Sequence, residues 1–225
     1  MIKNVVFDFY GTLVDIWTDE SKEGFFEAVE EEFKDVKDFN GNLKKEYLKL
    51  CEEKQKEIEE IELLDVFKEL YNVDDKMASK IALKFRLLST YRMRLYRGVK
   101  KLLKWLNKHE YKVYLLSNAQ SCFTRPEMDM LGIVSYFDKI YLSSDYGVKK
   151  PNPKFFNQLI NDNNLVKEET VMIGNDANCD IKGAKNVGLN AIYMETETST
   201  LGVMEPDVKG FSARKLIKLI KKMWF

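Results

Sequence analysis

Five short apolar runs constrain the fold of this chain more than any other feature of its sequence. They are rich in Val, Ile, Tyr and Leu, as parallel strands buried on both faces are. The runs are NVVFDF (4–9), KVYLLSN (112–118), KIYLSS (139–144), TVMIGN (170–175) and NAIYM (190–194). Apolar residues at helical spacing lie among and after them, at 99–106, 155–160, 181–184 and 216–223, the last preceded by a cap at Ser212. This alternation predicts an α/β fold with a doubly wound parallel sheet.

The stretch between the first and second runs breaks the alternation. It carries three long amphipathic patterns and no convincing strand, with apolar positions at 26–36, 47–61 and 77–88 and a possible cap at Asp74. We therefore expect an α/β core made of residues 1–15 and 97–225, with an all-helical insertion at 16–96. The run CEEKQKEIEEIE (51–62) inside the insertion is interpreted as a solvated helix face with paired Glu and Lys side chains.

Composition argues against several classes of function. The 36 basic and 36 acidic residues leave no net charge to attract nucleic acid or a membrane surface. The first apolar run is too short for a signal peptide, and no run approaches the ~20 apolar residues of a membrane span. Three scattered cysteines predict neither a disulfide framework nor a thiolate zinc site, and fit a reducing cytoplasm. A single histidine, His109, disfavours a zinc hydrolase or a Ser-His-Asp triad.

Polar residues follow the predicted strands at the points where they end. The first strand ends on Asp8, the second on Ser117 and Asn118, and Lys150 comes shortly after the third; the fourth is followed by Asn175, Asp176 and Asp180. Ligands of open parallel sheets bind outside the carboxyl ends of the strands, so we expect these side chains to share one crevice.

The chemistry open to such a set is specific. A carboxylate such as Asp8 can attack phosphorus or carbon and form a covalent intermediate, while Lys150 offsets its charge. A serine hydroxyl and backbone N–H groups can bind phosphate oxygens. Asp176 and Asp180 could hold Mg²⁺, which prefers oxygen ligands, and a cation would relieve the repulsion among the carboxylates.

Four segments in order at the strand ends give the chain a family resemblance: DFYGTLVD (8–15), LLSN (115–118), KKPNPKFF (149–156) and IGNDANCDIKGAKNVGL (173–189). With these segments the chain resembles the haloacid dehalogenase (HAD) superfamily of hydrolases over nearly its whole length. The branch it resembles has a helical cap inserted after the first strand. The resemblance implies a HAD-like Rossmannoid core and a cap that closes over the substrate and selects it.

The resemblance also implies a role for each matching residue. Asp8 would be the nucleophile, and the catalytic set would be Asp8, Tyr10, Lys150 and Asp180. Substrate binding would fall to Ser117, Asn118 and Thr12, and a Mg²⁺ cofactor to Asp8, Tyr10, Asn175 and Asp176. Which of Asn175, Asp176 and Asp180 ligates the metal directly stays open. Lys149 is interpreted as a solvated neighbour of Lys150, and Arg92, Arg94 and Arg97 as surface charge rather than substrate anchors.

Two positions depart from the pattern of HAD phosphatases. Most carry a second aspartate two residues after the nucleophile, where it protonates the leaving group, and this chain has Tyr10 there. A tyrosine at this position is typical of 2-haloacid dehalogenases, which need no metal. Against that reading, the arginine-containing pattern of the dehalogenase cap finds no match in this chain. The fourth segment also carries Asp176, where dehalogenases tend to be less acidic. Asn175 replaces the first aspartate after glycine; its amide oxygen can still ligate Mg²⁺.

Three functions follow from these features. The first is a Mg²⁺-dependent phosphatase acting on a small phosphorylated metabolite through an aspartyl intermediate. The alternative is a metal-independent 2-haloacid dehalogenase. The third is a catalytically weak HAD-like binding protein. In each case the expected partner is a small molecule; its identity and the oligomeric state stay open.

Overall fold

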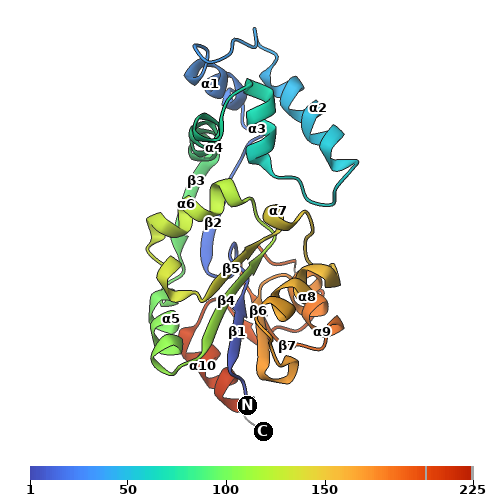
Figure 1. The fold of residues 1–225 in the computed structure, drawn as a ribbon. Coiled ribbons are helices and arrows are strands. Elements are labelled where there is room, and N and C mark those ends of the chain that lie inside the picture. The colour runs from blue at the N-terminus through green and yellow to red at the C-terminus, as the bar shows by residue number, and fades with distance from the viewer. Residues whose placement is uncertain (201, 224–225) are drawn as a thin grey trace.

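A parallel sheet forms the centre of the molecule in the computed structural model, which describes residues 1–200 and 202–223 (Figure 1). Its strand order is β5-β4-β1-β6-β7-β8, and every neighbouring pair is parallel. The strands are β1 (Asn4–Phe7), β4 (Lys112–Ser117), β5 (Lys139–Leu142), β6 (Thr170–Gly174), β7 (Asn190–Glu195) and β8 (Val208–Lys209). The first five coincide with the five apolar runs, so the predicted doubly wound α/β fold is confirmed.

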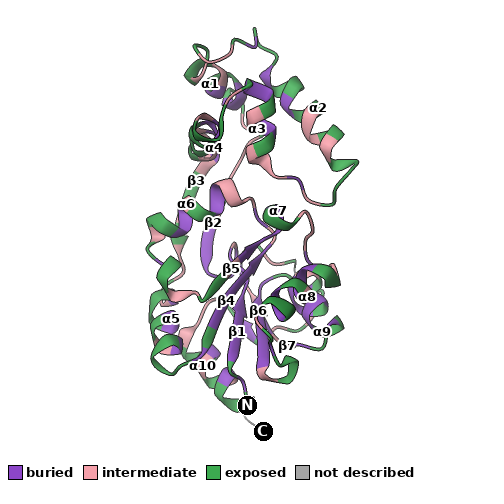
Figure 2. Cartoon of the chain, in the orientation of Figure 1, coloured by how far each residue is buried: buried purple, intermediate pink, exposed green. Residues whose placement is uncertain are grey.

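Helices cover both faces of the sheet because each central strand is apolar on both sides. All residues of β1 and β6 are buried, as Figure 2 shows. Val5 and Phe7 pack with α5 (Val99–Lys108) and α10 (Ala213–Lys222), while Val6 faces α8 (Pro153–Asp162) and α9 (Gly183–Asn186). The other core helices are α6 (Ser121–Leu131) and α7 (Ser143–Tyr146), with short 3₁₀ turns η1 (Val134–Tyr136) and η2 (Lys167–Glu169) and a π-helical turn η3 (Ala177–Lys182).

The insertion between β1 and α5 forms a second apolar cluster, which also includes Phe123 of α6. The helices of the insertion are α1 (Phe25–Glu32), α2 (Leu43–Gln55), α3 (Leu63–Tyr71) and α4 (Asp75–Ser89). Phe25, Phe67 and Phe85 are buried in this cluster, and the Phe85 ring packs against the other two at centroid distances of 4.8 and 5.2 Å. Asp74 caps α4 as expected, accepting from the N–H of Met77 at 2.9 Å. The boundaries proposed for core and insertion remain a prediction.

The prediction that the insertion contains only helices is wrong. Its two ends form an antiparallel ribbon of β2 (Val14–Thr18) and β3 (Thr90–Leu95), which joins the insertion to the core in Figure 1. Arg92 and Arg94 lie on one side of β3, and both pair with Asp15 of β2, at 2.8 and 2.9 Å. These arginines are therefore part of the ribbon. The ribbon is a two-stranded sheet and is partly exposed, so neither strand has the apolar composition of a strand buried on both faces.

The acidic loop, residues 56–62, is a second difference from expectation. The helical pattern at 47–61 stops with α2 at Gln55, and the loop that follows lies against the core instead of continuing a solvated helix. Gln120 donates to Glu60 at 3.0 Å and to the Ile61 carbonyl at 2.9 Å. Further contacts tie Glu62 to Ser144, Glu60 to Lys149 and Glu59 to Asn152, so Lys149 is not merely solvated.

None of the helices in the described residues is long and apolar enough to cross a membrane.

Candidate active site

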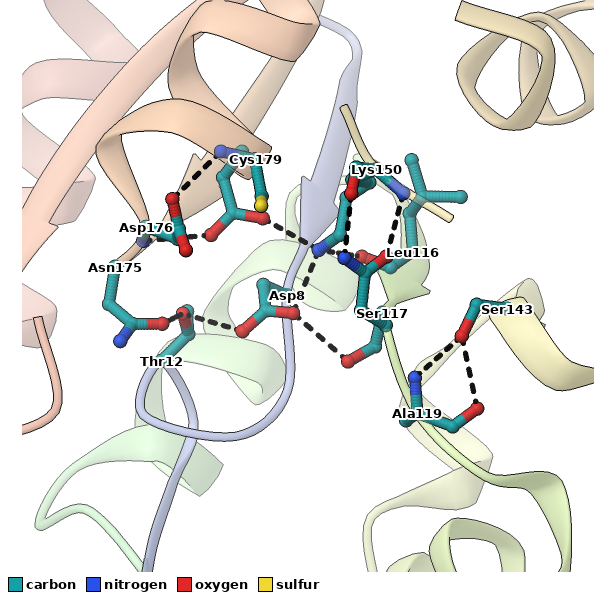
Figure 3. A network of polar contacts seen from close by, with 12 residues as sticks. Asp8, Thr12, Leu116, Ser117, Ala119, Ser143, Lys150, Asn175, Asp176 and Cys179 are labelled. Carbon is teal, nitrogen blue, oxygen red and sulfur yellow. Dashed lines mark hydrogen bonds and ion pairs between the residues drawn. The ribbon is translucent and has the colours of Figure 1, made fainter. Parts of the chain in front are cut away.

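Asp8 lies just beyond the last residue of β1, with its carboxylate almost fully buried. Its Oδ1 accepts from Ser117 Oγ at 3.0 Å and from Lys150 Nζ at 2.8 Å, and its Oδ2 accepts from Thr12 Oγ1 at 3.1 Å. These donors come from the end of β4, from the loop before α8 and from the turn after β1 (Figure 3). The structure thus brings the predicted nucleophile and its predicted partners together.

The chain turns sharply after Asp8, and Gly11 makes this turn possible. The N–H of Leu13 donates to the carbonyl of Phe9 at 2.8 Å, and Gly11 has a φ of +78°. A Cβ atom at Gly11 would lie 2.2 Å from Thr198 Oγ1 and 2.4 Å from Asn175 Nδ2. Only glycine allows both the left-handed conformation and this close approach.

Lys150 links two carboxylates at the centre of the site. Its buried Nζ donates to Asp8 at 2.8 Å, to Asp180 at 2.6 Å and to the carbonyl of Leu116 at 2.7 Å. Burial alone would lower the pKa of Lys150, but Asp180 and then Asp8 outweigh it and hold that pKa above its ordinary value. The lysine therefore stays charged and offsets part of the negative charge of the two aspartates.

Asp180 is buried beside this lysine. Burial raises the pKa of Asp180, Lys150 opposes the rise, and Asp8 adds to it. Its second oxygen accepts from the backbone N–H of Asp176 at 3.0 Å. Asp180 is thereby fixed as the partner of Lys150.

Asn118 acts on Lys150 through the backbone. Its Oδ1 accepts from the Lys150 N–H at 2.7 Å, and its Nδ2 donates to the Lys150 carbonyl at 2.8 Å. Both ends of the amide are used in these contacts, so the side chain positions the lysine. Any contact of Asn118 with substrate stays a prediction.

Two polar residues after β6, Asn175 and Asp176, make different contacts. Asn175 Oδ1 accepts from Thr12 Oγ1 at 2.9 Å, which places the amide oxygen beside Asp8. One oxygen of Asp176 accepts from the N–H groups of Asn178 and Cys179, at 2.8 and 2.7 Å, and so caps η3. Of these two residues, Asn175 is the one linked to the nucleophile by a shared hydroxyl.

Tyr10 turns its hydroxyl toward α6. The hydroxyl donates to the carboxylate of Glu127 and contacts Thr124 Oγ1 at 2.9 Å. Burial, followed by the negative charge of Glu127, raises the pKa of Tyr10 far above its ordinary value. Glu127 in turn accepts from Arg86 Nε of α4 at 2.7 Å. The phenol is therefore a neutral, engaged donor and is poorly suited to protonate a leaving group.

A cavity of about 220 Å³ adjoins these groups. It is lined by Asp8, Tyr10, Ser117, Asn118, Lys150, Asn175, Asp176, Cys179, Asp180 and Thr198. Thr12 is fully buried behind Asp8 and Asn175 and does not line it. Sequence reasoning missed Thr198, although it follows β7, which pairs with β6, and the strand-end rule applies there too.

The oxygen donors at Asp8 suit a hard divalent cation. The described residues contain no group of three or more His, Cys, Asp or Glu side chains that could hold a metal ion. Asp8 Oδ2 and Asn175 Oδ1 nevertheless converge on one hydroxyl, that of Thr12, at 3.1 and 2.9 Å. Mg²⁺ commonly takes one or two carboxylates and fills its other positions with water and substrate phosphate, so this donor set fits Mg²⁺.

Comparisons with known proteins place these features in context. A model described as haloacid dehalogenase-like hydrolase matches residues 2–188. Glyceraldehyde 3-phosphate phosphatase of Methanothermobacter thermautotrophicus is 33% identical over 92 residues, which make up 41% of each chain. The match thus spans well under half of that curated relative.

Two solved structures cover nearly the whole chain. A HAD phosphatase from Thermococcus onnurineus has a TM-score of 0.64 at 20% identity and covers 97% of this chain and 98% of its own. A 2-haloacid dehalogenase from Pseudomonas syringae has a TM-score of 0.68 at 17% identity and covers 99% of both chains. At these identities the similarity establishes the fold and does not choose between the two reactions.

Proposed function

This chain belongs to the haloacid dehalogenase-like hydrolase family, and from that premise we propose that it is a Mg²⁺-dependent phosphatase acting on a small phosphorylated metabolite. The observation that carries the proposal is the set of groups around Asp8. A cationic Lys150 and the Ser117 hydroxyl contact one of its oxygens, and the amide oxygen of Asn175 lies beside the other. The phosphatase relative that matches part of the chain supports the same reaction.

Asp8 would act as the nucleophile. One of its carboxylate oxygens bonds to phosphorus while the bond from phosphorus to the leaving oxygen breaks, and water then releases phosphate and restores the carboxylate. Lys150 and Ser117 are placed to stabilise negative charge on the phosphoryl oxygens. Since the Tyr10 hydroxyl is engaged with Glu127, the leaving oxygen would take its proton from water.

The residues that would hold Mg²⁺ are Asp8 and Asn175, with the free oxygen of Asp176 as a further candidate. Tyr10 would have to join this set through its main-chain carbonyl, because its phenol donates to Glu127 and contacts Thr124. When bound, Mg²⁺ stabilises the negative charge of the transferred phosphoryl group.

The 2-haloacid dehalogenase stays as a second candidate because of Arg86. Its guanidinium lies 5.4 Å from the centre of the Tyr10 ring, so an arginine from the insertion does approach the site. The buried carboxylate of Glu127 already balances its charge, however, at 2.7 Å. This pairing makes Arg86 a poor anchor for a substrate carboxylate and favours the phosphatase.

An assay with p-nitrophenyl phosphate tests the proposal, because this leaving group scarcely needs a proton. We expect hydrolysis with Mg²⁺, loss of activity in EDTA, and recovery when Mg²⁺ is restored. Asp8→Asn should be inactive, whereas Asp129→Asn, at an exposed carboxylate, should match the unmodified protein. Activity that survives EDTA, or metal-independent halide release from 2-chloropropionate, would overturn the phosphatase proposal.

A further inference from the structure

Asn175 raises a problem of orientation that a carboxylate in its place would not. A carboxylate presents two equivalent oxygens, but an amide presents one oxygen and one NH₂ group. Only the oxygen can bind a cation, so a half-turn of the Asn175 side chain would replace a ligand with a donor that repels the metal. The site therefore requires something that fixes the direction of this amide.

The threonine loop, residues 196–199 after β7, contacts the amide on the side away from Asp8. Asn175 Nδ2 donates to Thr198 Oγ1 at 2.9 Å, while Oδ1 accepts from Thr12 at 2.9 Å. The loop is itself held against the site, because Ser199 Oγ donates to the Asn175 carbonyl at 2.7 Å. Thr198 is thus placed against the NH₂ group by a fixed loop.

A hydroxyl can donate or accept, so the direction of this contact depends on where each proton goes. Thr196 Oγ1 lies 2.7 Å from the carbonyl oxygen of Gly11, which can only accept, so Thr196 must donate there. Thr198 Oγ1 lies 3.5 Å from Thr196 Oγ1, and Thr196 has no proton left to give it, because that proton goes to Gly11. Thr196 therefore does not compete for the lone pairs of Thr198, which accept from the NH₂ group of Asn175 at 2.9 Å.

We propose that Thr198 is a positioning residue that, together with Thr196, turns the amide oxygen of Asn175 toward Asp8 and the metal. The inference rests on the proposed function, since it concerns the ligand geometry of the proposed Mg²⁺ site. It explains how this chain keeps a metal ligand at a position where an amide replaces a carboxylate. Thr198 acts only through Asn175 and has no role in the chemical steps.

The test compares Thr198→Val in two backgrounds, with Mn²⁺ binding followed by electron paramagnetic resonance as a readout that needs no turnover. In the otherwise unmodified protein, we expect Thr198→Val to weaken Mn²⁺ binding about 10-fold, as loss of an outer-shell partner does. Thr198→Ser keeps the hydroxyl and should restore binding to within about 2-fold. In the Asn175→Asp background, Thr198→Val should have less than about a 2-fold effect, because either carboxylate oxygen can ligate.

Thr200→Val serves as the control, since Thr200 is an exposed threonine next to the same loop and should leave binding unchanged. Unfolding temperatures measured without metal identify any variant that fails to fold. If Thr198→Val fails to fold, Thr198→Ser is compared with the unmodified protein instead. Equal loss of Mn²⁺ affinity in both backgrounds, or no loss in either, would overturn the inference while leaving the proposed function intact. Failure of the unmodified protein to bind Mn²⁺ or Mg²⁺ would instead overturn the metal-dependent function.

Discussion

The state of the Tyr10 hydroxyl determines whether this residue can supply a proton to the leaving group. Its position in the sequence is that of the acid in related phosphatases, but its hydroxyl donates to Glu127 and its pKa is raised by burial and by that carboxylate. The proposed reaction therefore proceeds without an acid from this residue, and substrates with good leaving groups should be cleaved much faster than alkyl phosphates.

Tyr10→Phe separates the two possible roles of this side chain. We expect activity on an alkyl phosphate such as glycerol 1-phosphate, whose leaving group does need a proton, to fall by far less than the ~10²-fold that removal of a general acid causes. The free energy of unfolding should fall by about 1–3 kcal/mol, because buried Glu127 loses a donor. Steady-state kinetics and urea unfolding measure the two effects.

Tyr141→Phe is the matched control for this change, since Tyr141 is a buried tyrosine that donates to Asp162 at 3.1 Å and lies outside the cavity lining. A large loss of activity in Tyr10→Phe with stability unchanged would mean that the phenol is the acid after all.

The strand-end rule found most of the candidate site at the level of single residues. Ser117 ends a strand and Asp8, Lys150 and Asp180 come after strands, and the sheet brings each within hydrogen-bond distance of at least one other member of the set. The rule also points to the segment of Thr198, which follows β7, but not to the contacts of Thr198, and it could not predict the positions of Glu127 and Arg86. Thr198 lies in a loop whose path depends on contacts with Gly11 and Asn175, and the other two meet only through packing between helices.

Helices α4 and α6 are joined by a buried ion pair between Arg86 and Glu127. Their side chains are 13% and 2% exposed, and the Arg86 guanidinium also lies over the Tyr10 ring. The pair thus connects the insertion to the turn that carries the nucleophile. Removing one partner leaves an uncompensated charge in a nearly dry environment.

We expect Arg86→Met to lower the free energy of unfolding by about 3–5 kcal/mol. Adding Glu127→Gln should recover part of this loss, because the uncompensated charge is removed while an acceptor for Tyr10 remains. Lys84→Met is the control; Lys84 pairs with Glu32 at 3.0 Å with side chains 37% and 44% exposed, and its loss should change stability by at most about 1 kcal/mol. Urea unfolding is measured for Arg86→Met, for Glu127→Gln and for the double variant. If the loss of unfolding free energy in the double variant equalled the sum of the two single losses, the ion pair would carry no coupling energy.

Helices and strands with a strong apolar pattern were predictable from the sequence. Elements whose position depends on contacts with other segments were not. The strands β1, β4 and β6 are buried on both faces, so their composition is sufficient to identify them. The ribbon strands β2 and β3 owe their pairing to each other and to the Asp15 ion pairs, and helix α3 begins where Glu62 accepts from the N–H of Leu64 at 3.1 Å.

At the scale of the whole molecule, the insertion contacts the core at several separate places. The ribbon continues from the nucleophile turn, the Arg86–Glu127 pair links α4 to α6, and the acidic loop is bound by Gln120 and Lys149. Lys149 directly precedes Lys150. We therefore expect movements of the insertion to shift the positions of Asp8 and Lys150. Such a connection suits a cap that selects the substrate.

The central claim is that Asp8 carries the phosphoryl group during turnover, and chemical trapping tests it most directly. The protein is quenched with acid while it turns over an aryl phosphate with Mg²⁺, and then reduced with borohydride, which converts an aspartyl phosphate to homoserine. We expect peptide mass spectrometry to find homoserine at position 8, only when both substrate and Mg²⁺ are present and not in Asp8→Asn. Reduction at another carboxylate, or phosphate release in a pre-steady-state burst with Asp8 unmodified, would contradict the account.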